Sequence, residues 1–543
     1  MEEIGVVLSL LAAVVVSSAF ARATRLALPL VQISLGALIA LSPLQTVRLD
    51  PEIFFVLFLP PLLFLDGWRI PKRELVRHRI VIVELALGLV VLTVVGLGFF
   101  IHWLIPAMPL PVAFALAAIV SPTDPVAVSA VTRRTPIPRR VRYILEGESL
   151  LNDASGLVCM RFAIAAMLTG SFSLPGAVVA FLWVAIGGLL IGASVTWGIA
   201  ALRRWASARL GEDTGTEILV SLLIPFGAYL IAELLHCSGI LAVVAAGVTM
   251  SLTENQESRA VTRVRRTAVW DTVQLAASGA IFVLLGEQIP EIVSGASETV
   301  RQTGQEGAWR LALYVLAIVG ILALLRFAWV WTSLRLTWFR SQGVGEIRPR
   351  PGRKLVLMMS LAGVRGTVTL AGILTLPLAL ADGSPFPVRD LAIFLAAGVI
   401  LVWLSAATLF LPSLVTRLDL PPEPMDEAAE DRLRRAAAEA AIQAIEAAQH
   451  SLAAGRADAD FHADAAARIM EMYRLRIEAS PDEAESTPLA RRIESIERQL
   501  RIAGLRAERR AIFQAGRSGA IDEITMRKMV REVDLQEARY AGS

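Results

Sequence analysis

Cysteine is almost absent from this 543-residue chain, which contains only Cys159 and Cys237. Both lie in apolar runs, so a disulfide framework and a zinc site with cysteine spacing are excluded. Charged residues make up only 19% of the chain and hydrophobic residues 55%, whereas soluble domains average about 25% charged residues. This composition excludes a soluble globular enzyme, a disordered chain, and a collagen or coiled-coil filament.

Lysine is also scarce, because only three of the 52 basic residues are lysine. With the abundance of alanine and arginine, this suggests a GC-rich bacterial genome. The net charge of +3 does not indicate a nucleic-acid partner, but the distribution of charge is informative. Charged residues number 57 in residues 1–416 and 44 in residues 417–543. We therefore expect a transmembrane domain over 1–416 and a cytoplasmic helical domain over 417–543.

Apolar runs predict an all-α polytopic membrane protein, since a helix needs about 20 apolar residues to cross a bilayer. No basic region precedes the first run and no clean cleavage site follows it, so we interpret it as a span rather than a signal peptide. We expect thirteen transmembrane helices, at about 4–20, 28–42, 52–66, 80–104, 110–131, 143–168, 174–201, 216–236, 238–252, 270–286, 309–333, 354–381 and 389–412.

Basic residues predict the orientation. The loops and flanks that follow the odd-numbered spans carry 25 lysines or arginines, whereas those that follow the even-numbered spans carry only Arg48, Arg301, Arg310 and Arg389. Positively charged loops stay in the cytoplasm. The N-terminus is therefore expected outside and the charged C-terminal tail inside.

The fifth expected span is interrupted by Ser121-Pro122-Thr123-Asp124-Pro125. Each proline removes a backbone donor and disfavours α geometry in the residue before it. The freed carbonyls cannot face lipid, so they are expected to line a polar cavity. A simple kink is the alternative, but Thr123 and Asp124 within the break favour a site.

The sixth expected span carries a polar face. At about 100° per residue, Glu148, Ser149, Asn152, Asp153 and Gly156 fall within one arc of roughly 140°. Counted from the inner surface, Asp153 lies about 15 Å deep. Acids within the membrane usually mark an ion or proton path, although a structural pairing between helices is the alternative.

The twelfth expected span contains Arg365 between Gly363 and Gly366, about 16 Å from its start. The glycines permit a second interruption, and a charge at this depth is usually functional. Interrupted helices at matching positions indicate an inverted repeat, here spans 1–6 against 8–13. Arg161 and Arg326 lie nearer to span ends, from which their side chains are expected to snorkel to the interface.

These motifs, together with Leu59-Pro60-Pro61-Leu62-Leu63-Phe64 and Asp66, resemble the monovalent cation:proton antiporters of the NhaP and NHE type. The resemblance covers the whole membrane block. It implies a homodimer in the bacterial inner membrane, with thirteen helices and a crossed pair of broken helices. It also implies exchange of sodium, or of potassium or lithium, for protons by an elevator-like motion.

By this resemblance, Asp153 is the carboxylate that alternately holds the cation or the proton. Asn152 is its neutral neighbour, which implies electroneutral exchange. Thr123 and Ser149 supply ligand oxygens, and Asp66 lies near the ion unless it is only a solvated interfacial acid.

Two further roles follow from the same resemblance. Asp124 is expected among the half-helix ends, and Glu148 is expected to pair with Arg365. Oxygen ligands suit a hard monovalent cation, and one acid that holds either ion couples the two fluxes by competition alone. The sequence therefore calls for no cofactor.

Three alternatives remain. A potassium/proton antiporter would use the same mechanism, and a cation channel could use the same acids. An intramembrane protease could use Asp124 and Asp153 as a dyad, although the surrounding hydroxyls fit ion coordination better. The tail predicts helices at about 426–454, 458–479, 488–516 and 521–540, as either a solvated bundle or a regulatory module.

Overall fold

The structure is a computed structural model that describes most of the chain. It covers residues 2–24, 26–41, 51–70, 82–124, 128, 139–169, 174–211, 213–253, 260–302, 309–342, 352–380, 383–417, 427–453, 459–478, 487–518 and 523–541. The chain divides into two compact units, Met1–Leu420 and Pro421–Ser543, each described by itself.

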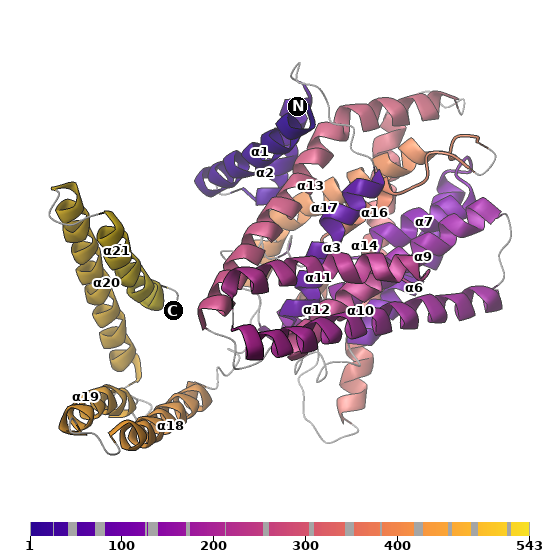
Figure 1. Ribbon diagram of the computed structural model, residues 1–543. Coiled ribbons are helices and arrows are strands. Elements are labelled where there is room, and N and C mark those ends of the chain that lie inside the picture. Colours follow the sequence, from indigo (N-terminus) through magenta and orange to yellow (C-terminus); the bar gives the residue numbers. More distant parts are fainter. Residues whose placement is uncertain are drawn as a thin grey trace. The chain divides into compact units, whose positions relative to one another are not determined.

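The first unit is a bundle of helices (Figure 1). Its first half contains α1 (Glu2–Thr24), α2 (Leu28–Ala40), α3 (Pro51–Arg69), the π-helical turn η1 (Glu84–Gly88), α6 (Leu89–Leu104), α7 (Leu110–Val120) and α9 (Arg139–Thr169). Its second half contains α10 (Leu174–Leu210), α11 (Thr214–Leu234), α12 (Gly239–Thr253), α13 (Ala260–Gln302), α14 (Trp309–Gln342), α15 (Arg353–Leu361), α16 (Thr367–Leu374) and α17 (Arg389–Thr416).

Every span expected from the sequence overlaps one of these helices or a pair of them. Among the described residues, eight helices have stretches long and apolar enough to cross a membrane by length and composition. The apolar helices α2, α7 and α12 are shorter. The all-helical, polytopic fold is thus confirmed, whereas the number thirteen stays a prediction.

Glycine lets the helices of the bundle approach closely. Gly36 of α2 and Gly286 of α13 each face the backbone of the other helix, so closely that a Cβ at either position would collide with it. Small residues permit such contacts in membranes, where packing rather than the hydrophobic effect holds helices together. Their contact helps to hold α2 along α13.

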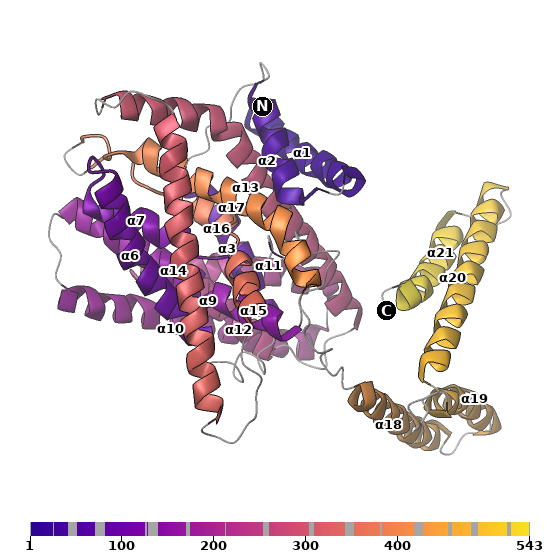
Figure 2. The ribbon, with the colours of Figure 1, turned by 180° about the vertical axis from the view of Figure 1, so that it is seen from behind.

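Two helices are interrupted, as the sequence predicted. Helix α7 ends at Val120, and residues 121–124 are not helical. The twelfth expected span is divided into α15 and α16, separated by residues 362–366 (Figure 2). The second half of the fifth expected span falls mostly outside the described residues.

The two interruptions lie against each other. The backbone amide of Asp124 donates a 2.7 Å hydrogen bond to the carbonyl of Val364. This bond joins residues 240 positions apart and brings the ends of three half-helices, α7, α15 and α16, to one place in the interior.

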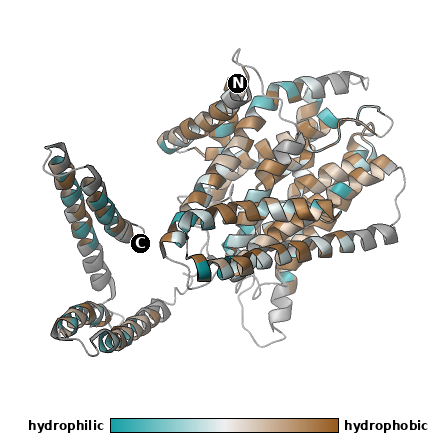
Figure 3. Ribbon diagram, in the orientation of Figure 1, coloured by the Kyte–Doolittle hydropathy of each residue, from teal (hydrophilic) through white to brown (hydrophobic). Residues whose placement is uncertain are grey.

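The second unit consists of α18 (Glu427–Ala453), α19 (Ala459–Glu478), α20 (Thr487–Arg517) and α21 (Glu523–Ala541). Helices α18 and α19 pack together, as do α20 and α21. The α20–α21 pair buries a small core of Leu505, Ile512 and Val533. Hydrophilic and hydrophobic residues alternate along these two helices (Figure 3), as expected for helices with one solvated face.

Candidate functional site

The polar face of α9 lies in the interior of the first unit. Glu148, Ser149, Asn152 and Asp153 are all buried, with at most 3% of any of them exposed. Buried polar side chains need partners, because an unsatisfied one costs about 1–3 kcal/mol. Side chains whose polar atoms all have partners are therefore interpreted as structural, and those with an unpartnered oxygen as candidate ligands.

Ser149 and Asn152 fix the position of the break that follows α7. The Ser149 hydroxyl donates to the backbone carbonyl of Thr123 at 2.5 Å, and the Asn152 amide donates to the Thr123 hydroxyl at 3.1 Å. Because Ser149 and Asn152 are three residues apart in α9, both side chains face the same side, toward Thr123 in the non-helical segment that follows α7. The structure thus places Thr123 beside Ser149, the two residues that the resemblance implies as ligands, and their role in binding stays a prediction.

Three oxygens at this place have no hydrogen-bond partner within the described part of the chain. They are Oδ1 of Asp153, Oδ1 of Asn152 and Oγ of Ser121. A carboxylate, an amide carbonyl and a hydroxyl oxygen are the ligand types that hard cations prefer. Asp66 and Asp124 are close enough to Asp153 to interact with it electrostatically. The surroundings therefore favour a positive charge or a proton.

Asp124 caps the second half of the interrupted twelfth span. Its Oδ2 accepts a 3.2 Å hydrogen bond from the backbone amide of Thr367, the first residue of α16. A carboxylate at this end also stabilises the positive end of the helix dipole. Gly366 allows this approach, since a Cβ there would collide with the Asp124 carboxylate.

Arg365 lies at the C-terminal end of α7, whereas Asp124 lies at the N-terminal end of α16. Its Nε donates a 3.0 Å hydrogen bond to the carbonyl of Val120, the last residue of α7, and its Nη1 donates to the carbonyl of Gly363. The guanidinium also lies 4.1 Å from the centre of the Trp403 ring. A cation at a helix C-terminus and over an aromatic face is stabilised by both.

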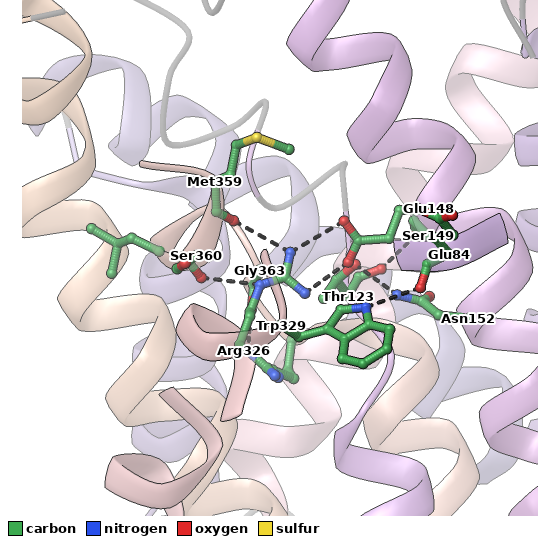
Figure 4. Close-up of polar contacts among 12 residues, drawn as sticks. Glu84, Thr123, Glu148, Ser149, Asn152, Arg326, Trp329, Met359, Ser360 and Gly363 are labelled. Atoms are coloured by element: carbon green, nitrogen blue, oxygen red, sulfur yellow. Dashed lines mark hydrogen bonds and ion pairs between the residues drawn. The ribbon is translucent and has the colours of Figure 1, made fainter. Parts of the chain in front are cut away.

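The predicted pair of Glu148 with Arg365 is wrong, because Glu148 pairs with Arg326 of α14. Nη1 of Arg326 lies 2.7 Å from Oε1 of Glu148, and Nη2 lies 3.4 Å from Oε2. The same guanidinium donates to the carbonyls of Met359 and Ser360 at the end of α15 (Figure 4). Arg326 is thus both the partner of an acid and the cap of a helix.

The expectation that Arg326 snorkels is also wrong, because its side chain is fully buried. The sequence placed the end of this span at residue 333, but α14 continues to Gln342, so Arg326 lies at its middle. The amphipathic residues between 334 and 342 were the signal that could have shown this. Arg161, by contrast, forms a half-exposed 2.8 Å ion pair with Glu233.

A π-helical turn, which sequence reasoning missed, packs against α9 and α14. The indole of Trp329 donates a 2.9 Å hydrogen bond to the carbonyl of Glu84, the first residue of η1. Gly88 makes room for this ring, since a Cβ there would collide with it. Such turns are frequent at functional sites, and this one anchors η1 to the helix that carries Arg326.

The chain is similar to known proteins of one family. The family described as "Sodium/hydrogen exchanger, transmembrane" matches residues 7–417. The Escherichia coli protein named "Uncharacterized Na(+)/H(+) exchanger YjcE" is 40% identical over 519 residues, which cover 94% of this chain and 93% of that protein. A sodium, potassium, lithium and rubidium/proton antiporter from Bacillus subtilis is 38% identical over 518 residues, covering 95% of this chain and 74% of that protein.

A solved structure shares the fold. The sodium proton antiporter MjNhaP1 from Methanocaldococcus jannaschii aligns with a TM-score of 0.58 at 20% identity. The alignment covers 77% of this chain and 99% of that one. At this identity the likeness concerns the fold alone.

Proposed function

The chain belongs to the sodium/hydrogen exchanger family, and we propose that it exchanges sodium for protons at one buried carboxylate, that of Asp153. It is a multi-pass membrane transporter rather than an enzyme. The observation that carries the proposal is the buried Asp153 Oδ1 without a hydrogen-bond partner among the described residues. An oxygen in this state can accept a proton or coordinate a cation.

Competition between the two ions couples their fluxes. An ionised carboxylate in the protein interior is costly unless an opposite charge compensates it. Asp153 is therefore either protonated or bound to a cation, and one species must leave before the other binds. Oδ1 of Asn152 and the oxygens of Ser121, Thr123 and Ser149 are the candidate ligands that complete the coordination.

Asp124, Asp66, Glu148 and Arg365 have supporting roles in this proposal. Asp124 and Arg365 compensate the half-helix ends at the crossing, so they keep the site polar without transporting charge. The Glu148 carboxylate is neutralised by Arg326. Asp66 is half-buried in α3 and adds negative potential close to Asp153, which favours cation entry.

With Asn152 beside Asp153, one carboxylate exchanges one proton for one monovalent cation, so we propose electroneutral transport. The protein acts as a homodimer in the inner membrane of a bacterium, with the N-terminus outside and the C-terminal unit in the cytoplasm. The excess of basic residues in the loops and flanks that follow the odd-numbered spans supports this orientation, because positively charged loops stay in the cytoplasm. Potassium is a second candidate substrate, because the Bacillus relative is named for several monovalent cations.

A proteoliposome assay tests the proposal. Purified protein is reconstituted into vesicles that contain a pH-sensitive dye, and a gradient of sodium, potassium or choline chloride is imposed. We expect sodium-dependent proton flux and none with choline. A current without proton coupling would indicate a channel, and the absence of any cation-dependent flux would contradict the proposal.

A further inference from the structure

A hollow with both polar and apolar lining residues lies apart from the crossing of the broken helices. Residues from α10, α11, α12 and α13 line it. It lies near the C-terminal end of α10 and the N-terminal end of α13, and both of these helix ends are rich in arginine. The transport mechanism does not use it.

Two arginines are the charged residues of its lining. Arg266 of α13 is fully buried, with its guanidinium 5.5 Å from the ring centre of Trp68. Arg203 of α10 also lines the hollow and is close enough to Arg266 for the two charges to repel each other. Oε2 of Glu217 lies 3.6 Å from Nη1 of Arg203. Within the described part of the chain, this cluster therefore holds two positive charges and one negative charge.

Thr196 supplies an independent sign of a ligand. This lining residue of α10 is 1% exposed, and its hydroxyl has no hydrogen-bond partner among the described residues. A threonine within a helix usually donates to a carbonyl of the preceding turn. A buried hydroxyl that makes no such bond, in a hollow lined by two arginines, is available to donate to an anion.

We propose that this hollow binds a phosphate group, held by the guanidiniums of Arg203 and Arg266 and by the Thr196 hydroxyl. The planar fork of arginine matches the geometry of phosphate oxygens. The phosphate comes either from the headgroup of an anionic phospholipid or from free inorganic phosphate. Exposed Leu219 and Leu223 of α11, each next to a lining residue, would accommodate acyl chains of a lipid.

Delipidated full-length protein in a non-ionic detergent provides the test. Native mass spectrometry measures the affinity for phosphatidylglycerol, with diacylglycerol of the same acyl chains as the control without phosphate. A thermal-unfolding assay measures stabilisation by inorganic phosphate against chloride at equal ionic strength. Preference for phosphatidylglycerol supports a lipid headgroup, and stabilisation by inorganic phosphate supports a free anion.

Three variants locate the binding. Arg266→Gln should weaken it about 100-fold, and Thr196→Val, which keeps side-chain volume and charge, about tenfold. Arg265→Gln removes an exposed charge from the neighbouring position and should leave the affinity within about twofold. Thr196→Val alone decides the result if Arg266→Gln does not fold.

Two results would overturn the proposal. One is equal binding of diacylglycerol and phosphatidylglycerol together with no stabilisation by inorganic phosphate over chloride. The other is phosphate or lipid binding that Thr196→Val leaves unchanged, since the anion would then be held elsewhere.

Discussion

The polar face of α9 carries two buried acids, Glu148 and Asp153, whose surroundings differ. Glu148 is held by Arg326, which also caps α15, so both charges are compensated. Asp153 has a carboxylate oxygen without a hydrogen-bond partner in the described part of the chain. The two acids are equally buried, so burial alone does not distinguish a structural charge from a transporting one.

The difference lies in what each acid would lose by changing its charge. Protonation of Glu148 would leave the buried Arg326 guanidinium without its counter-charge, which is strongly unfavourable. Protonation of Asp153 or binding of a cation to it leaves no other side chain uncompensated among its described contacts. A transport group must change its charge state in each cycle. Of these two acids, only Asp153 can do so without leaving a buried charge uncompensated.

The largest expected effect is that of Asp153→Asn. Asparagine keeps the shape of the side chain but cannot titrate, so cation-dependent proton flux in proteoliposomes should disappear. The protein should still fold, because an uncharged amide at this position needs no counter-charge. The exposed carboxylate of Asp213 gives the matched control, since Asp213→Asn should keep full transport. Transport by folded Asp153→Asn would contradict the assignment.

The structural role of the Glu148–Arg326 pair is tested by the free energy of unfolding of its variants. Arg326→Gln and Glu148→Gln should each cost about 3–5 kcal/mol, because each leaves a buried charge without its partner. The double variant should recover part of this loss. Thermal unfolding in detergent measures both, with Arg161→Gln as the control at a half-exposed pair expected to cost about 0–1 kcal/mol. Additive losses would show that the two residues are not coupled.

A smaller loss of stability is expected at the crossing. Asp124→Ala removes the acceptor for the Thr367 amide and should cost about 1–2 kcal/mol. Asp124→Asn retains an oxygen acceptor and should cost less than about half of that. The thermal-unfolding assay compares the two variants, and equal losses would show that the carboxylate's charge, not its hydrogen bond, stabilises this helix end.

An exposed carboxylate extends the comparison to the surface. Hydrogen bonds from the hydroxyl and amide of Thr216 hold the pKa of Asp213 below its ordinary value of 3.8. A lowered pKa in the folded state stabilises the fold at pH values above 3.8. This contribution is lost as the pH falls through the lower folded-state value. The protection of amide hydrogens in the first turn of α11, relative to their intrinsic exchange rate at each pH, should therefore fall in that acidic range, and less so in Asp213→Ala.

The smallest change is expected for Asn152→Asp. A second acid beside Asp153 raises the charge of the site, but it must also reach both sides of the membrane and release its proton in each cycle. Exchange by the variant should therefore remain insensitive to a potassium–valinomycin clamp, as we expect for the wild-type protein. A reversal potential that follows the imposed voltage in the variant alone would show that one added carboxylate makes transport electrogenic.

Sequence alone predicted the helical membrane fold, the separation of the charged tail, and both interruptions. These follow from local chemistry: a proline removes a backbone donor, and a long apolar run has few alternatives to a membrane helix. The polar face of α9 was also predictable from its helical periodicity, whereas the contacts of Ser149 and Asn152 with Thr123 were found only in the tertiary structure.

Only the tertiary structure decided which charges pair. Arg326 and Arg365 are both buried arginines near Glu148, and the sequence contains no signal for choosing between them. The choice depends on which carbonyl groups each guanidinium reaches. Arg365 is adjacent to the end of α7, whereas Arg326 of α14 reaches both the end of α15 and Glu148. Pairing of buried charges depends on distances between helices far apart in the chain, and local sequence patterns carry no information about those distances.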